Sequence, residues 1–432
     1  MIRDRRAILA LLTALNFLNY IDRAVIAAVL KPMRGELAMT NFEAGLLSSA
    51  FLVGYFVTSP MFGARADKGS RKGLIAFGVV IWSLATVASG MAHSFGQLLA
   101  ARAVVGFGEA SFAVLAPTII DDITPKDRKG MALAVFFLAI PLGYALGYII
   151  GGSIAQHHGW RAAFFVCGGP GLLLAASVLL IEEPERKLLD AKARLIDGLR
   201  EVARIPLFRR AVLGYCAYTG ALGAFSYWAP NYLLVAFPGV LDDQSANLWF
   251  GVVLLAAGAV GTFGGGRWMD RSLRRMPQVP EGAAYDVPEQ KAQVNQMLKI
   301  CATGTLLAAP FTVACFLMPV PAAFFAAAFV AEIGLFLSTS PVAAACLRAV
   351  PEERRASSTA AMIFSIHLFG DLWSAAALGL LQDWLPIVVA MMALPIVFGW
   401  TTLIWWPRRR EAVSNRVAVS PPPTAVVHRG SR

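Results

Sequence analysis

Long apolar stretches separated by short polar connections follow one another along most of the chain. A helix needs about 20 mostly apolar residues to cross a bilayer, and twelve stretches reach that length. The first contains Asn16, Asn19, Asp22 and Arg23, and no cleavage site follows it, so we expect a retained helix and not a signal peptide. The predicted membrane helices lie at about 7 to 30, 43 to 64, 73 to 92, 95 to 120, 131 to 152, 160 to 181, 210 to 236, 247 to 268, 298 to 318, 322 to 347, 357 to 381 and 386 to 406.

Composition agrees with an all-α integral membrane protein. Of the 432 residues, 57% are hydrophobic and 15% are charged, whereas water-soluble domains have roughly half apolar and a quarter charged residues. A soluble enzyme, a disordered chain and a disulfide scaffold are therefore excluded, the last because the five cysteines fall inside apolar stretches. The net charge of +11 does not indicate nucleic-acid binding, because the basic residues occupy short segments between apolar stretches.

The basic residues predict the orientation of the chain. With the N-terminus inside, nearly all of the 38 Lys and Arg residues outside the spans fall on one side, and Lys31, Arg34 and Arg161 fall on the other. By the positive-inside rule both termini are cytoplasmic. We expect the protein to reside in a bacterial inner membrane as a monomer without a cofactor.

The chain divides into two halves of six spans. Residues 1–181 and 210–407 form the halves, and residues 182–209 form an amphipathic linker that we expect to lie along the inner membrane surface. Residues 408–432 are polar or rich in proline and are predicted to be disordered.

An internal repeat relates the two halves. Five positions after the second span recur after the eighth, each displaced by about 203 residues, which indicates two parallel six-span repeats. The first set is Gly63, Asp67, Lys68, Arg71 and Lys72, and the second is Gly266, Asp270, Arg271, Arg274 and Arg275. A second match pairs Pro125, Arg128 and Lys129 with Pro351, Arg354 and Arg355.

These motifs resemble those of the major facilitator superfamily. Within it, the stretches at 19–23, 102–117, 139–149 and 367–371 are similar to the Spinster family of lipid transporters. The resemblance implies a proton-linked carrier of lysophospholipids or sphingoid phosphates that works by alternating access. It also implies that the ten repeated loop residues form a cytoplasmic gate.

Four charged residues within the spans are candidates for proton coupling. A charge in a bilayer costs about 2.5–3.5 kcal/mol even on permissive scales, so each requires a partner or a function. Asp22 and Arg23 lie in the first span, and Arg102 and Glu109 lie seven residues apart on one stripe of the fourth. We expect Asp22 and Glu109 to carry protons, as the Spinster resemblance also implies, with Arg23 changing partner between two states. The alternative is a permanently paired cluster that locks the helices together.

The second half contains fewer such groups. His367 and Asp371 are four residues apart in the eleventh span and therefore adjacent on one helix face, and histidine changes charge near physiological pH. They complete the predicted coupling set, although Asp371 could simply fix the tautomer of a structural histidine.

Several residues are candidates for a substrate cavity between the halves. Some are polar or have a polar tip that could meet a substrate, and Phe112 could line an apolar cavity suited to an acyl chain; ordinary packing is the alternative for each aromatic residue. The candidates are Asn19, Tyr20, Phe112, Tyr215, Tyr218 and Glu332. In the fifth span, Gly143, Gly147 and Gly151 form a flat stripe against which another helix can pack or slide.

No pattern for enzymatic chemistry is present. His157 and His158 lack ligands at metal-binding spacing, and Gly264 to Gly266 lack the context of a phosphate loop. The predicted function is proton-coupled transport of an amphipathic lipid. The alternatives are a proton symporter of small organic anions, in which Arg23 would hold a carboxylate, and a receptor that binds without transporting.

Overall fold

The computed structural model describes residues 2–66, 69–125, 128–183, 199–280 and 284–407. Apart from an isolated bridge between Ile2 and Ile181, the regular structure in these ranges is helical. The predicted tail at 408–432 and much of the linker lie outside the described residues. At the end of the linker, Val202 is buried, as an amphipathic helix requires.

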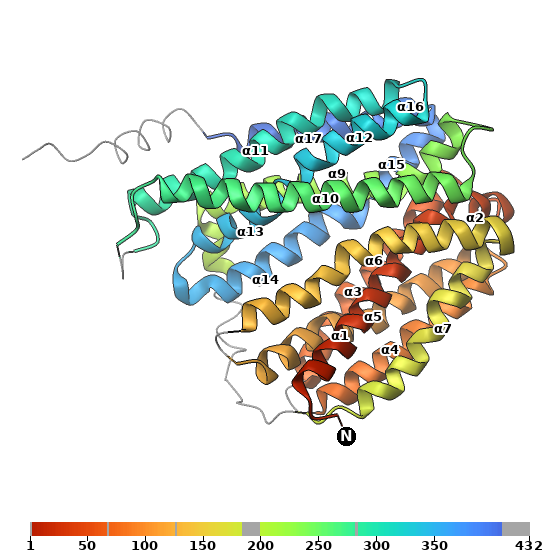
Figure 1. Ribbon diagram of the computed structural model, residues 1–432, viewed down its shortest axis with the longest axis horizontal. Helices are drawn as coiled ribbons and strands as arrows, with labels where there is room; N and C mark the ends of the chain where they lie inside the picture. Colours follow the sequence, from red (N-terminus) through yellow and green to blue (C-terminus); the bar gives the residue numbers. More distant parts are fainter. Residues whose placement is uncertain (1, 67–68, 126–127, 184–198, 281–283, 408–432) are drawn as a thin grey trace, which may run out of the picture.

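Seven helices form the first half of the molecule (Figure 1). They are α1 (Arg5–Ala28), α2 (Leu30–Glu36), α3 (Asn41–Ala66), α4 (Arg71–Gly90), α5 (Phe95–Ile123), α6 (Lys129–His158) and α7 (Trp160–Leu179). Side-chain caps fix several starts: the Asp4 carboxylate accepts from the Arg6 amide, and the Ser70 and Ser94 hydroxyls cap α4 and α5. The short helix α2 was not predicted from the sequence.

The second half has the same long helices with more interruptions. It contains α9 (Pro206–Ala236), α10 (Asp243–Arg274), α11 (Pro288–Leu317), α12 (Pro321–Phe336), α13 (Thr339–Arg348), η1 (Glu352–Arg354), α14 (Arg355–Ile366), the π-helical turn η2 (His367–Asp371), α15 (Leu372–Trp384), α16 (Ile387–Met391) and α17 (Ala393–Trp405). The spans predicted at 322 to 347, 357 to 381 and 386 to 406 are therefore each built from more than one helical segment.

Eleven membrane-length apolar helices occur among the described residues. They match eleven of the twelve predicted spans. The twelfth prediction, at 210 to 236, falls on α9, which has 31 residues and is long enough to cross a bilayer. Its two arginines and its tyrosines, threonine, serine and asparagine make it less apolar than the others.

The core of the first half is aromatic and aliphatic. Trp82 of α4, Phe112 of α5 and Phe136 of α6 stack in sequence, with ring centroids 5.8 and 5.9 Å apart. Leu12 of α1 packs into the same cluster. Buried packing of this kind fixes α1, α4, α5 and α6 relative to one another and so holds the charged residues of α1 and α5 in place.

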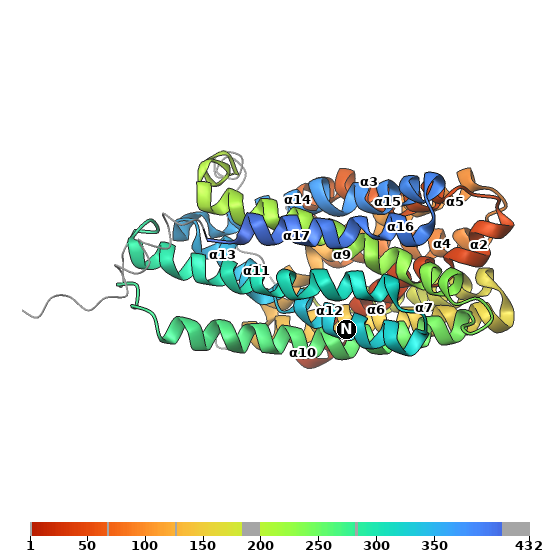
Figure 2. The ribbon, with the colours of Figure 1, turned by 90° about the horizontal axis from the view of Figure 1, so that it is seen from above.

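The two halves meet along α6 with α10 and along α3 with α15. Figure 2 shows α10 at one edge of the molecule and α3 with α15 at the opposite edge. We name the two ends of the bundle as follows: the α2 end carries α2, and the linker end carries the start of α1 and the end of α7, after which the linker begins. Figure 1 shows α6 and α10 side by side towards the α2 end and diverging towards the linker end.

Close backbone contacts hold the halves together at the α2 end. A Cβ added at Gly45 of α3 would lie 2.4 Å from the Ala375 carbonyl oxygen of α15, so the two backbones approach too closely for a side chain. Nearby, the Tyr227 hydroxyl donates to the Ala44 carbonyl at 2.5 Å, and Asn247 Nδ2 donates to the Ala28 carbonyl at 3.0 Å.

Candidate functional site

Two crossed ion pairs join α1 and α5 inside the first half. Arg23 Nε lies 2.8 Å from Glu109 Oε2, and Arg102 Nη1 lies 3.6 Å from Asp22 Oδ2. Both carboxylates and Arg102 are buried, whereas 15% of the Arg23 side chain is exposed. The structure thus brings together the four predicted coupling residues, but each carboxylate faces its own arginine and the two do not share one.

Three aromatic side chains lie around Arg23. Its guanidinium carbon lies 4.9 Å from the ring centroids of Tyr20 and Phe51 and 5.5 Å from that of Tyr55. Cation–π attraction of this kind contributes about 0.5–2 kcal/mol per contact, more when the groups are desolvated. Arg23 therefore has favourable surroundings that do not depend on its carboxylate partner.

Several polar atoms of the paired residues make no hydrogen bond within the described part of the chain. They are both carboxylate oxygens of Asp22, Oε1 of Glu109, and Nε and Nη1 of Arg102. A buried polar network that is only partly satisfied is sensitive to any change in protonation, because each unpaired group costs desolvation free energy. The arrangement suits groups that exchange partners.

The second half contributes a histidine and a carboxylate at a π-helical turn. His367 Nδ1 lies 2.9 Å from Asp371 Oδ2, and both side chains are 26% exposed. The His367 ring also contacts Phe56 of α3 across the two halves, at a centroid distance of 5.9 Å. Single π-turns inside helices often occur at functional sites. The predicted contact between His367 and Asp371 is therefore present.

Glu332 of α12 is buried, and no described residue bonds its carboxylate. Its side chain is 1% exposed, and neither carboxylate oxygen has a hydrogen-bond partner among the described residues. A permanently charged carboxylate in this position would be costly, so the residue requires a function or a proton.

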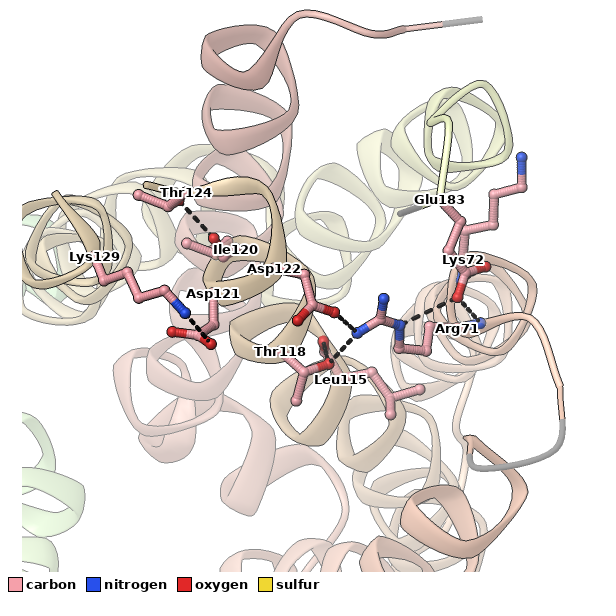
Figure 3. Close-up of polar contacts among 10 residues, drawn as sticks. All are labelled: Arg71, Lys72, Leu115, Thr118, Ile120, Asp121, Asp122, Thr124, Lys129 and Glu183. Atoms are coloured by element: carbon pink, nitrogen blue, oxygen red, sulfur yellow. Dashed lines mark hydrogen bonds and ion pairs between the residues drawn. The ribbon is translucent and has the colours of Figure 1, made fainter. Parts of the chain in front are cut away.

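The loop motif of the first half forms a polar cluster at the linker end (Figure 3). Arg71 Nη1 lies 2.6 Å from Asp122 Oδ2 of α5, and Arg71 Nε lies 3.1 Å from Glu183 Oε1, just after α7. Lys72 Nζ donates to the Ile181 carbonyl at 2.7 Å. Beside them, Lys129 Nζ lies 2.6 Å from Asp121 Oδ2.

Glu183 caps the start of α4 from outside that helix. Its carboxylate accepts hydrogen bonds from the Ser70 hydroxyl at 2.7 Å and from the Arg71 amide at 2.8 Å. Burial alone would raise the pKa of Glu183, but these hydrogen bonds outweigh it and hold the pKa below its usual value. The cluster therefore fastens α4, α5 and the end of α7 within one half and does not join the two halves.

The repeated motif in the second half differs in local structure. Its residues continue the helix α10, which ends at Arg274, whereas α3 ends at Ala66 and a new helix starts at Arg71. Four of the five motif residues are exposed, namely Asp270, Arg271, Arg274 and Arg275, and Gly266 is half-buried. Asp67 and Lys68 of the first motif lie outside the described residues. Among the described residues of the two motifs, no ion pair joins the first to the second, because Arg71 pairs within its own half.

The sequence profile of the Major Facilitator Superfamily matches residues 12–370. This chain belongs to the Major Facilitator Superfamily. Within the superfamily it belongs with the spinster homologues. It is 32% identical over 427 residues to the probable sphingolipid transporter spinster homolog 1 of Arabidopsis thaliana, covering 86% of this chain and 82% of that protein. It is also 32% identical over 401 residues to human protein spinster homolog 1, covering 87% and 72%.

Solved structures agree with this fold. A bacterial homologue of the human lysosomal transporter Spinster, in an inward-facing and unoccupied conformation, matches with a TM-score of 0.77 at 21% identity, covering 96% of this chain and 97% of that one. A D-xylose–proton symporter matches with a TM-score of 0.75 at 14% identity, covering 92% and 96%. The predicted superfamily, its Spinster subgroup and the assignment as a membrane transporter and not an enzyme are confirmed.

The predicted cavity residues of this Spinster-related transporter fall into two groups. Tyr20 lies beside Arg23, Asn19 is buried on the same helix, and Tyr215 is half-buried on α9. Phe112 and Tyr218 are both buried. Phe112 packs in the core of the first half, and the Tyr218 hydroxyl donates to the Leu335 carbonyl at 2.9 Å inside the second. Sequence spacing does not separate such packing from a cavity wall.

Sequence reasoning missed several residues of the transporter's polar clusters. Phe51 and Tyr55 of α3 face Arg23, and Asp122 and Glu183 hold Arg71. The two acidic residues follow the C-terminal ends of predicted spans, where a carboxylate gives no signal for a cap, because the helix start that they meet at Arg71 is distant in sequence. The aromatic residues gave no signal either, because their spacing is common to any apolar helix.

Proposed function

We propose that this transporter moves an amphipathic lipid by alternating access and couples the movement to protons. The observation that carries the proposal is the pair of crossed, buried ion pairs, Arg23 with Glu109 and Arg102 with Asp22. Two acids and two cations buried together are close to neutral, so the addition of one proton changes the partner of one arginine.

Glu109 and Asp22 are the proposed proton carriers. A proton that binds Glu109 neutralises the carboxylate and removes the charge that holds Arg23. Arg23 remains between Tyr20, Phe51 and Tyr55, where its guanidinium is available to an anionic group. In this way protonation would exchange an internal carboxylate for a substrate anion at the same cation, and loss of the proton would reverse the exchange.

His367 and Asp371 are proposed to extend the coupling to the second half. They are partly exposed and contact Phe56 of the opposite half, so a change in the charge of His367 would alter a contact between the halves. Glu332 is proposed as an acidic group that meets either a proton or the polar part of the substrate, because no described residue satisfies it.

The orientation proposed from the basic residues makes the linker end cytoplasmic. We place the transporter in the inner membrane of a bacterial cell. Because the halves diverge at the linker end, this conformation would open to the cytoplasm. In this arrangement α9 is the twelfth span, residues 1–181 and 210–407 are two bundles, and the transporter acts as a monomer. The repeated loop motifs would close the cytoplasmic end in the opposite state.

A lipid substrate is supported by the nature of the residues between the halves. Phe56 of α3 contacts Phe364 of α14 at 5.5 Å between ring centroids, and Phe364 is half exposed. Apolar aromatic surface near a buried arginine suits an acyl chain attached to an anionic head. The relatives named as sphingolipid transporters agree with this class of substrate.

A transport assay tests the proposal. Purified protein in proteoliposomes would be given labelled lysophospholipid with and without an imposed pH gradient. Gradient-dependent lipid movement is expected for the wild type, and Asp22→Asn and Glu109→Gln should each abolish the dependence while lipid binding is retained. Asp286→Asn removes an exposed carboxylate from a loop and serves as the matched control. Lipid movement that ignores the gradient in the wild type would refute the coupling.

The competing function is proton-coupled transport of a small organic anion. It requires Arg23, once a proton has released it from Glu109, to hold a substrate carboxylate, so the ion pair at 2.8 Å does not distinguish the two functions. Sugar acids in the same assay would decide between the two substrates. Movement of a sugar acid without movement of lipid would favour the second function, and binding of either without movement would indicate a receptor.

A further inference from the structure

A basic pocket lies at the linker end, outside the charge cluster of α1 and α5. It has a volume of about 580 Å³ and is enclosed by the start of α1, the end of α5 and the start of α6. Four arginines line it, together with one acid, Asp4. The arginines are Arg3, Arg5, Arg6 and Arg128.

Arg5 and Arg6 are the arginines of this pocket that are open to an anion. The Asp4 carboxylate accepts a hydrogen bond from the Arg6 backbone amide, and Arg3 pairs with Glu182. The side chains of Arg5 and Arg6 are exposed, and no ion pair involves them within the described ranges. A positive pocket of guanidinium groups is well suited to phosphate, which the planar guanidinium binds through two hydrogen bonds.

An apolar groove of about 550 Å³ continues from the basic pocket. Arg6, Leu9 and Val135 line both, so the two form one continuous depression between α1 and α6. Beyond Leu9 its walls are almost wholly apolar, and they reach Phe17 on α1 and Leu142 on α6. From residue 6 to residue 17, α1 rises roughly 16 Å at 1.5 Å per residue, which is about half of the ~30 Å hydrocarbon thickness of a bilayer.

The groove faces away from the charge cluster. Tyr144 of α6 contacts Tyr20 beside Arg23, with ring centroids 5.3 Å apart and the rings tilted by 57°. Leu142, which lines the groove, is two residues from Tyr144 and therefore lies on the opposite side of α6 at about 100° per residue. In Figure 1, α1 and α6 lie at the front of the molecule, uncovered by other helices. The groove is thus a surface that surrounding lipid can reach.

We propose that this depression binds one anionic phospholipid of the surrounding bilayer. Its phosphate would occupy the basic pocket and one acyl chain would lie in the groove, whose length equals the depth of one leaflet. Basic pockets between membrane helices on the cytoplasmic side recognise anionic headgroups in this way. The lipid would brace α1, which carries Asp22 and Arg23, against α6. This site is distinct from the transport path, and the proposal relies on the orientation given above only for the choice of leaflet.

Native mass spectrometry tests the headgroup pocket. Purified protein would be titrated with phosphatidylglycerol and, separately, with phosphatidylcholine, and the bound fraction counted. Wild type should bind one phosphatidylglycerol much more tightly than phosphatidylcholine. Loss of two surface cations, in the double variant Arg5→Gln with Arg6→Gln, should weaken phosphatidylglycerol binding about 30-fold, which corresponds to about 1 kcal/mol per basic residue. Arg200→Gln with Arg204→Gln removes two exposed cations of the linker and should leave the affinity unchanged.

A second variant tests the acyl groove without changing charge. Ala14 is exposed in the groove, so Ala14→Phe should fill it and weaken phosphatidylglycerol binding. Ala176→Phe on α7 places the same ring at an exposed site outside the groove and is the control. Equal binding of the two lipids, or equal loss in the test and control variants, would overturn the proposal. A second result would also overturn the proposal: phosphatidylglycerol does not bind the wild type, and the Arg5, Arg6 or Ala14 variants lose both transport and lysophospholipid binding. The pocket would then belong to the transported substrate.

Discussion

The carboxylate of Asp383 links the two halves at the α2 end. It belongs to α15 of the second half, yet it accepts hydrogen bonds from the backbone amides of Asn41 at 2.8 Å and Phe42 at 2.9 Å, at the start of α3 in the first. The residue is therefore an N-cap supplied by the opposite half. Any conformation that opens the α2 end must break this cap.

The magnitude follows from the exposure of the site. An N-cap contributes typically about 1 kcal/mol, and Asp383 is exposed, so we take that value and not the larger one of a buried charge. Asp383→Ala should therefore shift the equilibrium about fivefold towards the state open at the α2 end. Asp383→Asn keeps one acceptor oxygen and should shift it by less, roughly twofold.

Double electron–electron resonance measures this equilibrium. Spin labels at Met91 and Val240, both exposed near the α2 end, report its opening, and labels at Met131 and Phe263, both exposed on α6 and α10, report the linker end. All five native cysteines are buried, which favours selective labelling. In Asp383→Ala the long-distance fraction should rise at the α2 end and fall at the linker end.

The control is a cap at the same end that stays within one half. Asp242 caps its own helix α10 by accepting from the Ser245 amide at 2.7 Å. Asp242→Ala should lower thermal stability without changing the two distance distributions. If Asp383→Ala and Asp242→Ala leave the distributions equally unchanged, the cap does not hold the halves together and the reasoning is wrong.

Three further predictions concern stability, measured as melting temperature in detergent. Glu183→Gln should lower it, because the cap of α4 loses its charge; since the pKa of Glu183 is lowered in the fold, its contribution is present above about pH 4.5 and lost as the pH falls below that. The wild-type and variant curves should converge in acid. Gly147→Ala should lower it by a few degrees, because the added Cβ would lie 2.6 Å from Ala24 Cβ, whereas Gly169→Ala meets nothing within 4 Å and should not. Glu332→Leu should raise the melting temperature, with a gain of about 1–3 kcal/mol in unfolding free energy, because it removes a buried carboxylate that no described residue bonds. Transport should fall if Glu332 meets the substrate. An unchanged melting temperature would mean that Glu332 is already neutral and satisfied.

Much of the fold was predictable because bilayer thickness imposes helix length. Eleven apolar stretches, such as that of α4, correspond to described helices, and the repeat divides the chain at the linker. The breaks within spans were not predicted from hydropathy, although one of them has a local signal. The interruption between α12 and α13 at Leu337 and Ser338 adjoins Thr339, Ser340 and Pro341. Pro341 has no amide hydrogen to bond the carbonyl of residue 337, and its ring clashes with that carbonyl, so a regular helix cannot run through this point.

The charged residues of the site were predictable as a set but not as pairs. A charge within an apolar stretch is costly, so Asp22, Arg23, Arg102 and Glu109 stood out by composition alone. Their crossed pairing depends on the rotation of α1 against α5, which the sequence does not encode locally. A shared arginine and two separate arginines are equally compatible with the same spacing, and the structure decides for the second.

The distribution of polar contacts between the halves explains why this conformation is open at the linker end. At the α2 end, Asp383 caps α3, Tyr227 and Asn247 donate to backbone carbonyls of the first half, and Lys31 Nζ donates to the Leu234 carbonyl of the second at 3.2 Å. If the α2 end opens, each of these hydrogen bonds must break, and its donor and acceptor must bond water or a new partner. At the linker end, Arg71 pairs with Asp122 and Glu183 of its own half, and the matching charges after α10 are exposed. The repeated motif is therefore used unequally in this conformation: the first copy fastens its own bundle, and the charged residues of the second are exposed.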